Sequence, residues 1–354
     1  MFKQDIQRIG FACKYMHPDQ TQKPKILKEI QYKYTEAQTT VAWLKRQTTE
    51  VAEQKMWDIM EHNIQSMYNL IEWVGNQPEH LRMVRLGSNQ LPMYTQPDFR
   101  YFWQKPDVRE VCAKGYGRAG EIARKLDVRV SMHPGQFCVL ASDRPDVVER
   151  SIEEFEYHAD IIRWMGYGKN WQDFKCNVHI SGRQGPAGIK AVLPRLSREA
   201  RNCITIENDE MSWGVDASLE LEKEVALVLD IHHHWVRTGE YILPSDDRVR
   251  RIKDSWRGVR PAMHYSQCRE DLLVDHPAGI KPDMETLLEA GYKKQKLRAH
   301  SDFMWNDACN EWAAQFNKDF DIMVEAKCKN LASSQLLAEK QKATKLDSVA
   351  LIYA

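Results

Sequence analysis

The sequence lacks long hydrophobic runs, paired cysteine motifs and an excess of either charge. It has no stretch of about 18 apolar residues, and segment 1–10 lacks the apolar core of a signal peptide. We therefore expect a soluble protein that does not enter a membrane. The eight cysteines include no CxxC pair, which in a chain of this size predicts buried thiols in a reducing cytoplasm and argues against a disulfide framework or a zinc ribbon.

Motifs for nucleotide binding and for serine hydrolases are also missing. Neither a P-loop nor a GxGxxG pattern follows the first strand-like run, so we expect no nucleotide cofactor. No convincing GxSxG marks a nucleophilic serine. Lys and Arg together number 50, as do Asp and Glu, so the net charge of zero points to no polyanionic partner. Nucleic-acid binding nevertheless depends on a local basic face, which is compatible with a balanced total.

The composition is that of an ordinary globular protein. Its 354 residues are 43% hydrophobic and 28% charged, and the length suits two domains of roughly 150 residues or one large α/β barrel of about 250 residues or more. Apolar runs of strand length, typical of strands buried on both faces, occur at residues 8–13, 83–87, 128–132, 176–180, 203–207, 226–230, 261–265 and 321–325.

Helix-like stretches separate many of these runs. They cover residues 52–74, 106–126, 145–162 after an N-cap at Asp143, 304–316 and 331–344. Strands that alternate with helices predict a parallel sheet, either closed into a barrel or doubly wound. The count of eight favours a single (β/α)8 TIM-barrel domain over residues 1–354. We interpret the polar segment 271–296 as a long excursion within a loop.

Six consecutive predicted strands end at or near a residue type that binds metal ions. In chain order these residues are His133, His179, Glu207, Asp230, His264 and Glu325. The C-terminal ends of the strands of a parallel barrel meet at one rim, where barrel active sites lie. Imidazoles and carboxylates together suit Zn, Mn or Fe. His233 and His300 fall close to this series in the sequence.

A single histidine on a strand is more often a hydrogen-bonded core residue than a ligand. A carboxylate after four apolar residues is harder to dismiss, because burial of an unpaired charge is costly. Six such residues at the same relative position predict a multinuclear metal site, with Glu207 as the bridge between ions and His232 and His234 as structural or surface groups. Two or three divalent ions in such a site indicate hydrolysis at phosphorus.

Five short segments are similar to those of the ultraviolet damage endonuclease family and occur in the same order. They are residues 8–11 (RIGF), 133–137 (HPGQF), 207–210 (ENDE), 230–233 (DIHH) and 324–327 (VEAK). The resemblance spans roughly residues 8 to 331. It implies a TIM barrel related to endonuclease IV, with two to three divalent ions, Mn²⁺ first and Zn²⁺, Mg²⁺ or Co²⁺ as alternatives. It also implies a nick in duplex DNA immediately 5′ of a cyclobutane dimer, a 6-4 photoproduct or an abasic site.

The resemblance also implies how the ions are shared. His133 and His179 would hold one ion, which Glu207 would share with a second. Glu207 and His264 would also take part in catalysis, in which a hydroxide generated at the ions attacks the phosphodiester.

The resemblance also assigns the remaining ligands to ions. Asp230, His264 and Glu325 would complete the second site, and His233 with His300 would hold a third ion. The family often has a lysine two positions before the histidine of the seventh strand, where this chain has Ala262. The third site is therefore expected to be weak or to be completed differently, and Gln96 or a neighbour takes the place of an expected histidine.

Recognition of the lesion is expected to depend on the loop after the third strand. The family probes the damaged site with a glutamine followed by an aromatic residue, which matches Gln136 and Phe137. Phe137 keeps the stacking face of the usual tyrosine but lacks its hydroxyl group. Phe11, Lys14 and Tyr15 are further candidates for contact with DNA, although the family usually has Tyr at the first of these positions and Asn at the last.

We therefore expect a monomeric, ATP-independent endonuclease that acts on damaged double-stranded DNA in the cytoplasm. Two rivals keep the barrel and its metals: an abasic-site endonuclease of the endonuclease IV type, and a sugar isomerase or epimerase of the xylose-isomerase-like group. A third rival is a DNA-binding protein that has lost catalysis. The Gln136–Phe137 pair argues against a closed sugar pocket, and a full set of ligands for the first two ions argues against loss of catalysis.

Overall fold

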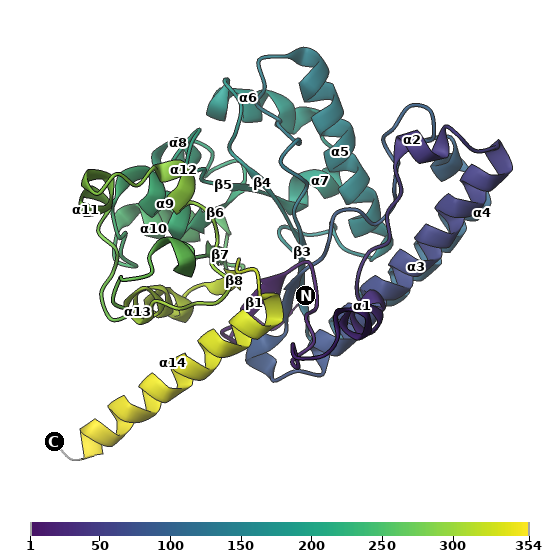
Figure 1. Cartoon of the computed structure of the whole chain (residues 1–354). Coiled ribbons are helices and arrows are strands. Elements are labelled where there is room, and N and C mark those ends of the chain that lie inside the picture. The colour runs from purple at the N-terminus through teal and green to yellow at the C-terminus, as the bar shows by residue number, and fades with distance from the viewer. Residues whose placement is uncertain (1, 353–354) are drawn as a thin grey trace.

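The computed structural model describes residues 2–352, with side-chain surroundings up to residue 342, and contains a closed barrel of eight parallel strands (Figure 1). Each strand pairs with the next, and the last pairs with the first, where Phe11 lies opposite Val324. The strands are β1 (Ile9–Ala12), β2 (Met83–Arg85), β3 (Arg129–Met132), β4 (Lys175–His179), β5 (Ile204–Glu207), β6 (Ala226–Asp230), β7 (Ala262–Tyr265) and β8 (Asp321–Val324). The predicted barrel is confirmed, and each strand overlaps a predicted run.

Helices surround the barrel, as the alternating pattern predicted. The longer ones are α3 (Thr49–Gly75), α4 (Pro106–Lys125), α5 (Pro145–Trp164), α10 (Asp247–Ser255) and α14 (Lys329–Ile352). The shorter ones along the barrel are α6 (Gly185–Val192), α7 (Arg198–Cys203), α8 (Val215–Leu219), α9 (Ile231–Thr238) and α13 (Asp307–Ala314). The N-cap of α5 is Arg144 rather than the predicted Asp143. Residues 1, 353 and 354 of the predicted domain lie outside the described residues.

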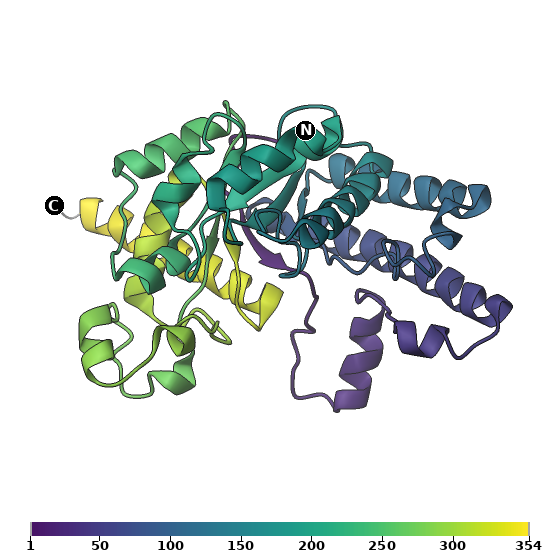
Figure 2. The same cartoon turned by 90° about the horizontal axis from the view of Figure 1, so that it is seen from above.

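Two long excursions leave the C-terminal ends of strands. The first follows β1 and contains α1 (Pro24–Tyr32) and α2 (Val41–Leu44). The second follows β7 and contains α11 (Met284–Glu289) and α12 (Lys294–Leu297), so the segment predicted as a loop carries two short helices. Figure 2 shows the two excursions projecting on the same side of the barrel. They therefore stand on either side of the rim at which the strands end.

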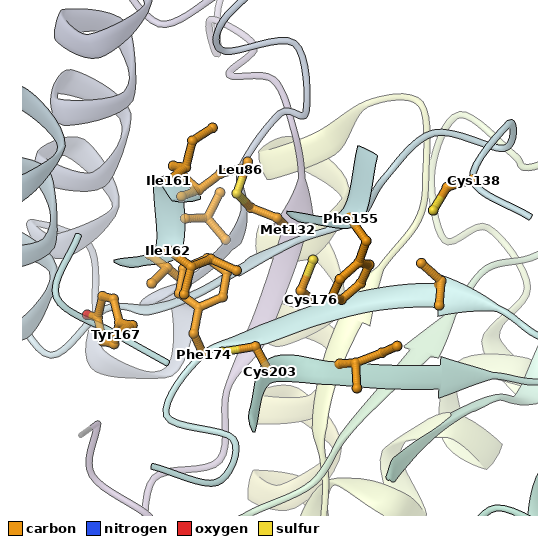
Figure 3. Packing of buried hydrophobic residues seen from close by; sticks show 14 of the residues in the cluster. Leu86, Met132, Cys138, Phe155, Ile161, Ile162, Tyr167, Phe174, Cys176 and Cys203 are labelled. Carbon is orange, nitrogen blue, oxygen red and sulfur yellow. The ribbon is translucent and has the colours of Figure 1, made fainter. Parts of the chain in front are cut away.

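Successive side chains of a strand point alternately toward the helices and into the barrel, so they pack in two separate hydrophobic clusters. Outward-facing residues pack against the helices, and Figure 3 shows Phe155 of α5 beside Cys176 of β4 in this outer core. A smaller cluster that includes Ala12, Met83 and Ala262 packs separately from it. All eight cysteines are free thiols. Among the described residues, no helix has the length and apolar character needed to cross a membrane.

Candidate metal centre

The C-terminal ends of the strands bring seven of the eight predicted ligands together with one residue that was not predicted, Glu210. They form four groups, in each of which one ligand atom per residue lies within 4.8 Å of the others. The groups are His133, His179 and Glu207; His179, Glu210 and His233; Glu207, Asp230 and His233; and Asp230, His264 and Glu325. Because the groups share members, they form one continuous cluster.

Glu207 occupies the middle of this cluster, at the end of β5. Its Oε1 lies 3.0 Å from Nδ1 of His264 and 3.5 Å from Nδ1 of His233. Its Oε2 lies 3.6 Å from Nε2 of His133 and 3.8 Å from Nε2 of His179. Burial opposes ionisation of this carboxyl group, but His264 and His179 outweigh it and hold the pKa of Glu207 well below its usual range. The side chain is therefore an anion surrounded by imidazoles, as a carboxylate that bridges cations must be.

Hydrogen bonds fix which ring nitrogen of His133 and His179 faces Glu207. Nδ1 of His133 lies 2.8 Å from the carbonyl oxygen of Pro134, and a carbonyl can only accept, so Nδ1 donates. Nδ1 of His179 donates to the carboxylate of Asp209 at 3.2 Å. Both Nε2 atoms are consequently left with a free lone pair that is directed at Glu207. Metal-binding histidines in proteins have this arrangement as a rule.

His264 has the opposite orientation, because Lys175 holds its other nitrogen. The Nζ atom of Lys175 lies 2.7 Å from Nε2 of His264. Nδ1 of the same ring faces the cluster and lies 3.3 Å from Oε1 of Glu325. Lys175 is the first residue of β4 and is 3% exposed, and its burial lowers the pKa of the ammonium group to about 7. Lys175 thus supports a predicted ligand from β4.

The carboxylates are also held from outside the cluster. Asn177 donates to Oε2 of Glu207 and accepts from the hydroxyl of Thr205 at 2.7 Å. Arg85 donates to Oε1 of Glu325. These partners come from strand positions inside the barrel, and their hydrogen bonds orient the carboxylates.

The cluster fits divalent cations, as the atoms without hydrogen bonds show. Within the described part of the chain, Oε1 of Glu207, Oδ2 of Asp230 and Nδ1 of His264 are buried and have no hydrogen-bond partner. Buried polar atoms are nearly always hydrogen-bonded. All three belong to predicted ligands, and Asp230 uses its other oxygen to cap α9 by accepting from the amide of His233 at 2.7 Å. A cation would satisfy all three atoms, and the donor set of imidazoles and carboxylates is the one that such ions prefer.

The ENDE segment after β5 supplies three supporting functions that sequence reasoning missed. The side chain of Asn208 pairs with the backbone of Asp230, donating to its carbonyl at 2.9 Å and accepting from its amide at 2.8 Å. Asp209 orients His179, and although burial opposes the shift, this histidine and two backbone amides lower the pKa of Asp209 to about 2. Glu210 turns toward His233. The position of these polar residues directly after a ligand was the available signal.

Histidines near the cluster differ in what they contact. His300 belongs to none of the four groups formed by the described residues; it pairs with Cys268 in an isolated β-bridge. Its ring lies 6.3 Å from that of His232. His232 is buried beside Trp235, and His234 bonds Glu240 at 3.0 Å. His232 and His234 therefore have structural surroundings, and the assignment of His300 to a metal stays a prediction.

The candidates for contact with DNA fall into two sets. Gln136 is exposed and Phe137 is 85% exposed, on the loop that starts at the ligand His133. Phe11 and Tyr15 are buried, at 2% and 6% exposed.

The interpretation of Phe11 and Tyr15 as DNA contacts needs correction. Phe11 points away from the barrel axis and packs edge-on against Trp73 of α3, with the ring centres 6.2 Å apart. Tyr15 packs against Tyr34 and Trp73 at 4.5 and 4.8 Å. Both rings belong to the outer core, where strand alternation and helix packing placed them. Lys14 is exposed and lines a hollow of about 550 Å³ at the rim.

The fold and the site together define a (β/α)8-barrel protein with a cluster of candidate metal ligands at the C-terminal rim of the barrel. A model of the family described as UV-endonuclease UvdE matches residues 7–353. The chain belongs to this family, so the predicted resemblance is confirmed.

The individual relatives have low sequence identity to this chain, although the family model matches nearly all of it. The UV-damage endonuclease of Neurospora crassa is 28% identical over 263 residues, which cover 66% of this chain and only 39% of the fungal protein. The UV DNA damage endonuclease of Bacillus mycoides is 24% identical over 314 residues, covering 85% of this chain and 87% of the relative. The chain thus spans about two fifths of the fungal relative and most of the bacterial one.

Two solved structures are similar in fold. The crystal structure of SacUVDE superposes with a TM-score of 0.68 at 22% identity and covers 96% of this chain and 99% of that chain. Endonuclease IV from Thermus thermophilus gives a TM-score of 0.50 at 11% identity over 79% of this chain and 94% of that chain. Both likenesses support the barrel architecture.

Proposed function

We propose that this protein is a metal-dependent endonuclease that nicks UV-damaged double-stranded DNA immediately 5′ of the lesion. The observation that carries the proposal is the cluster around Glu207, in a chain that belongs to the UvdE family. We further propose two to three divalent ions, Mn²⁺ first, and action as a monomer in the cytoplasm. The free state of all eight thiols is what a reducing compartment would maintain.

The chain's own residues would hold the ions and a phosphate between them. His133 and His179 would bind on one side of Glu207, and His264 on the other. Divalent ions at such a site lower the pKa of water and stabilise both the attacking and the leaving oxygen of a phosphodiester. Asn177 and Lys175 would keep the ligands oriented through their hydrogen bonds to Glu207 and His264.

Phe137 would recognise the lesion by insertion into the duplex. Its exposed ring stands four residues after the ligand His133, so a base pair in contact with the ring lies near the metal cluster. Enzymes that act within a base stack extrude nucleotides and fill the gap. An aromatic ring supplies the apolar surface for this, and Gln136 beside it supplies amide hydrogen-bonding groups. An exposed probe also favours a polymer substrate over a small sugar.

The test is incision of a defined oligonucleotide duplex that carries one cyclobutane dimer, in the presence of Mn²⁺. We expect a nick 5′ of the dimer with the parent protein, and loss of at least about a thousandfold in rate for Glu207→Gln, because the bridge loses its charge. Phe137→Ala should cut much more slowly while its free energy of unfolding changes by less than about 0.5 kcal/mol, since the ring is exposed.

Matched duplexes decide among the alternatives. A duplex with an abasic site tests the endonuclease IV type of activity, and an undamaged duplex is the control. Equal cleavage of the dimer duplex by parent and Glu207→Gln would overturn the nuclease proposal. Cleavage of only the abasic duplex, with no effect of Phe137→Ala, would overturn the proposed role of the probe.

A further inference from the structure

Glu210 lies at the edge of the cluster and is not among the ligands predicted from the sequence. It follows Glu207 by three residues, and its side chain is 9% exposed. Its Oε2 lies 3.7 Å from Nε2 of His233, and the two residues form a group with His179. A carboxylate and two imidazoles at this spacing can hold a divalent ion.

The hydrogen bond of His233 leaves Glu210 as the carboxylate that can share an ion with this histidine. Nδ1 of His233 lies 3.1 Å from the carbonyl oxygen of Asn208, so this nitrogen donates. The oxygens of Glu207 and Asp230 are near Nδ1, at 3.5 and 3.6 Å. The free lone pair is on Nε2, which faces Glu210. His233 can therefore share an ion with Glu210 without giving up its hydrogen bond.

Arg298 holds the other oxygen of Glu210. Nη1 of Arg298 lies 2.9 Å from Oε1, whereas His233 is near Oε2. Supporting partners of this kind also occur in the ligands already described, since Asn177 holds one oxygen of Glu207 and Arg85 holds one oxygen of Glu325. Glu210 thus has the arrangement of a metal ligand with a supporting partner.

We propose that Glu210, in place of His300, completes with His233 the site of the third divalent cation, which is additional to the ions on Glu207, and that Arg298 is the positioning residue of this site. The inference rests on the proposed function only for the presence of metal in the cluster. The one free nitrogen of His179 lies near Glu207 as well, whereas the free Nε2 of His233 faces Glu210, so we take Glu210 and His233 as the main ligands of the additional ion. His300 is not required.

The experiment counts the ions bound to the purified protein, with all 354 residues of the chain present. Metal-free protein is titrated with Mn²⁺ by calorimetry and by electron paramagnetic resonance, and metal content is measured after dialysis. We expect Glu210→Gln to lose one equivalent of Mn²⁺ relative to the parent. Glu240→Gln is the matched control, because Glu240 also lies between a histidine of α9 and an arginine, His234 and Arg248, but outside the cluster. It should bind as many ions as the parent.

Variants at Arg298 and His300 test whether Arg298 positions Glu210 and whether His300 binds the ion. Arg298→Gln should weaken the affinity of the last Mn²⁺ equivalent by about 10- to 100-fold, and Arg298→Lys should restore part of it. His300→Gln should keep all equivalents. If Glu210→Gln binds the full number with parental affinity, or if His300→Gln loses the equivalent instead, the proposal is wrong.

Two further outcomes decide between the metal site and the endonuclease function. If Glu210→Gln does not fold, as judged by circular dichroism, the Arg298 variants decide on the same readout. If the parent binds the additional ion through Glu210 but does not cut the dimer duplex, the metal site stands and the proposed endonuclease function fails.

Discussion

At the scale of single residues, the ligands divide their polar atoms between the ions and the protein. His133, His179 and His233 donate from Nδ1 to oxygen and leave Nε2 free. Only His264 presents Nδ1, and for this its Nε2 must donate to the uncharged amine of Lys175. A buried partner of this kind matters as much as a ligand, since an imidazole that can rotate loses affinity for metal.

Lys175→Met should therefore weaken the metal centre without unfolding the barrel. Methionine keeps the length and apolar character of the buried stem but leaves Nε2 of His264 without a partner. We expect Mn²⁺ affinity, measured by calorimetry, to fall by about 10- to 100-fold. Lys190→Met is the control, because Lys190 is half-exposed and pairs loosely with Glu224 at 3.8 Å. Equal loss in both variants would show that Lys175 does not act through His264.

At the scale of elements, the ends of strands supply ligands while the following segments supply their partners. The ENDE segment does both, since Glu207 ends β5 and the next three residues reach β6, β4 and α9 through Asp230, His179 and His233. In a similar way, the excursion after β1 supplies a hydrogen-bond partner to the loop after β2. Glu36 accepts from the side chain of Gln90 and from the amide of Asn89.

Glu36 should make stability depend on pH. Burial raises the pKa of Glu36 from 4.5 to about 7, so the folded state holds this proton more tightly than the unfolded state. The resulting contribution is complete below about pH 4.5 and is lost as the pH rises through 7. Glu36→Gln should remove this loss, which amounts to at most about 3 kcal/mol.

Urea unfolding at pH 5 and pH 8 checks the prediction. The free energy of unfolding should fall more between pH 5 and pH 8 for the parent than for Glu36→Gln. An identical pH dependence of the two proteins would mean that Glu36 titrates normally in the folded state.

At the scale of the whole molecule, the two ends of the barrel carry different charged clusters. The end opposite the metal centre is closed by Asp321, whose oxygens lie 2.7 Å from Nη1 of Arg129 and from Nε of Arg260. Asp321 also accepts from the amide of Arg8 at 2.9 Å. This cluster connects β8 and β3 with the segments directly before β1 and β7, so it contributes to closure of the barrel and not to chemistry.

Asp321→Asn should destabilise the protein by about 3–5 kcal/mol, because it leaves buried guanidinium groups without their anion. Affinity for Mn²⁺ should not change in the protein that remains folded. Asp319→Asn is the control, since Asp319 pairs with Lys253 at the surface and should cost less than about 1 kcal/mol. Thermal unfolding and calorimetry measure the two effects separately, and a loss of Mn²⁺ affinity in Asp321→Asn would contradict the separation of the two ends.

The sequence was sufficient for the barrel and for most ligands because both follow from local order. Strands buried on both faces read as apolar runs, and the residue type that ends each run is visible without knowledge of neighbours. His133, Glu207 and Glu325 could be identified in this way. The buried positions of Phe11 and Tyr15 could not, because the side of a strand or loop that faces a helix depends on packing across the chain.

By itself, then, the sequence determined the order of strands and helices, the rim on which the ligands stand and the family. The tertiary structure alone decided which side chains hold those ligands in place. Lys175 reaches His264 across 89 positions of sequence, and Arg298 reaches Glu210 across 88. Such contacts depend on closure of the barrel and on the fold of its excursions, and no local pattern of residues encodes them.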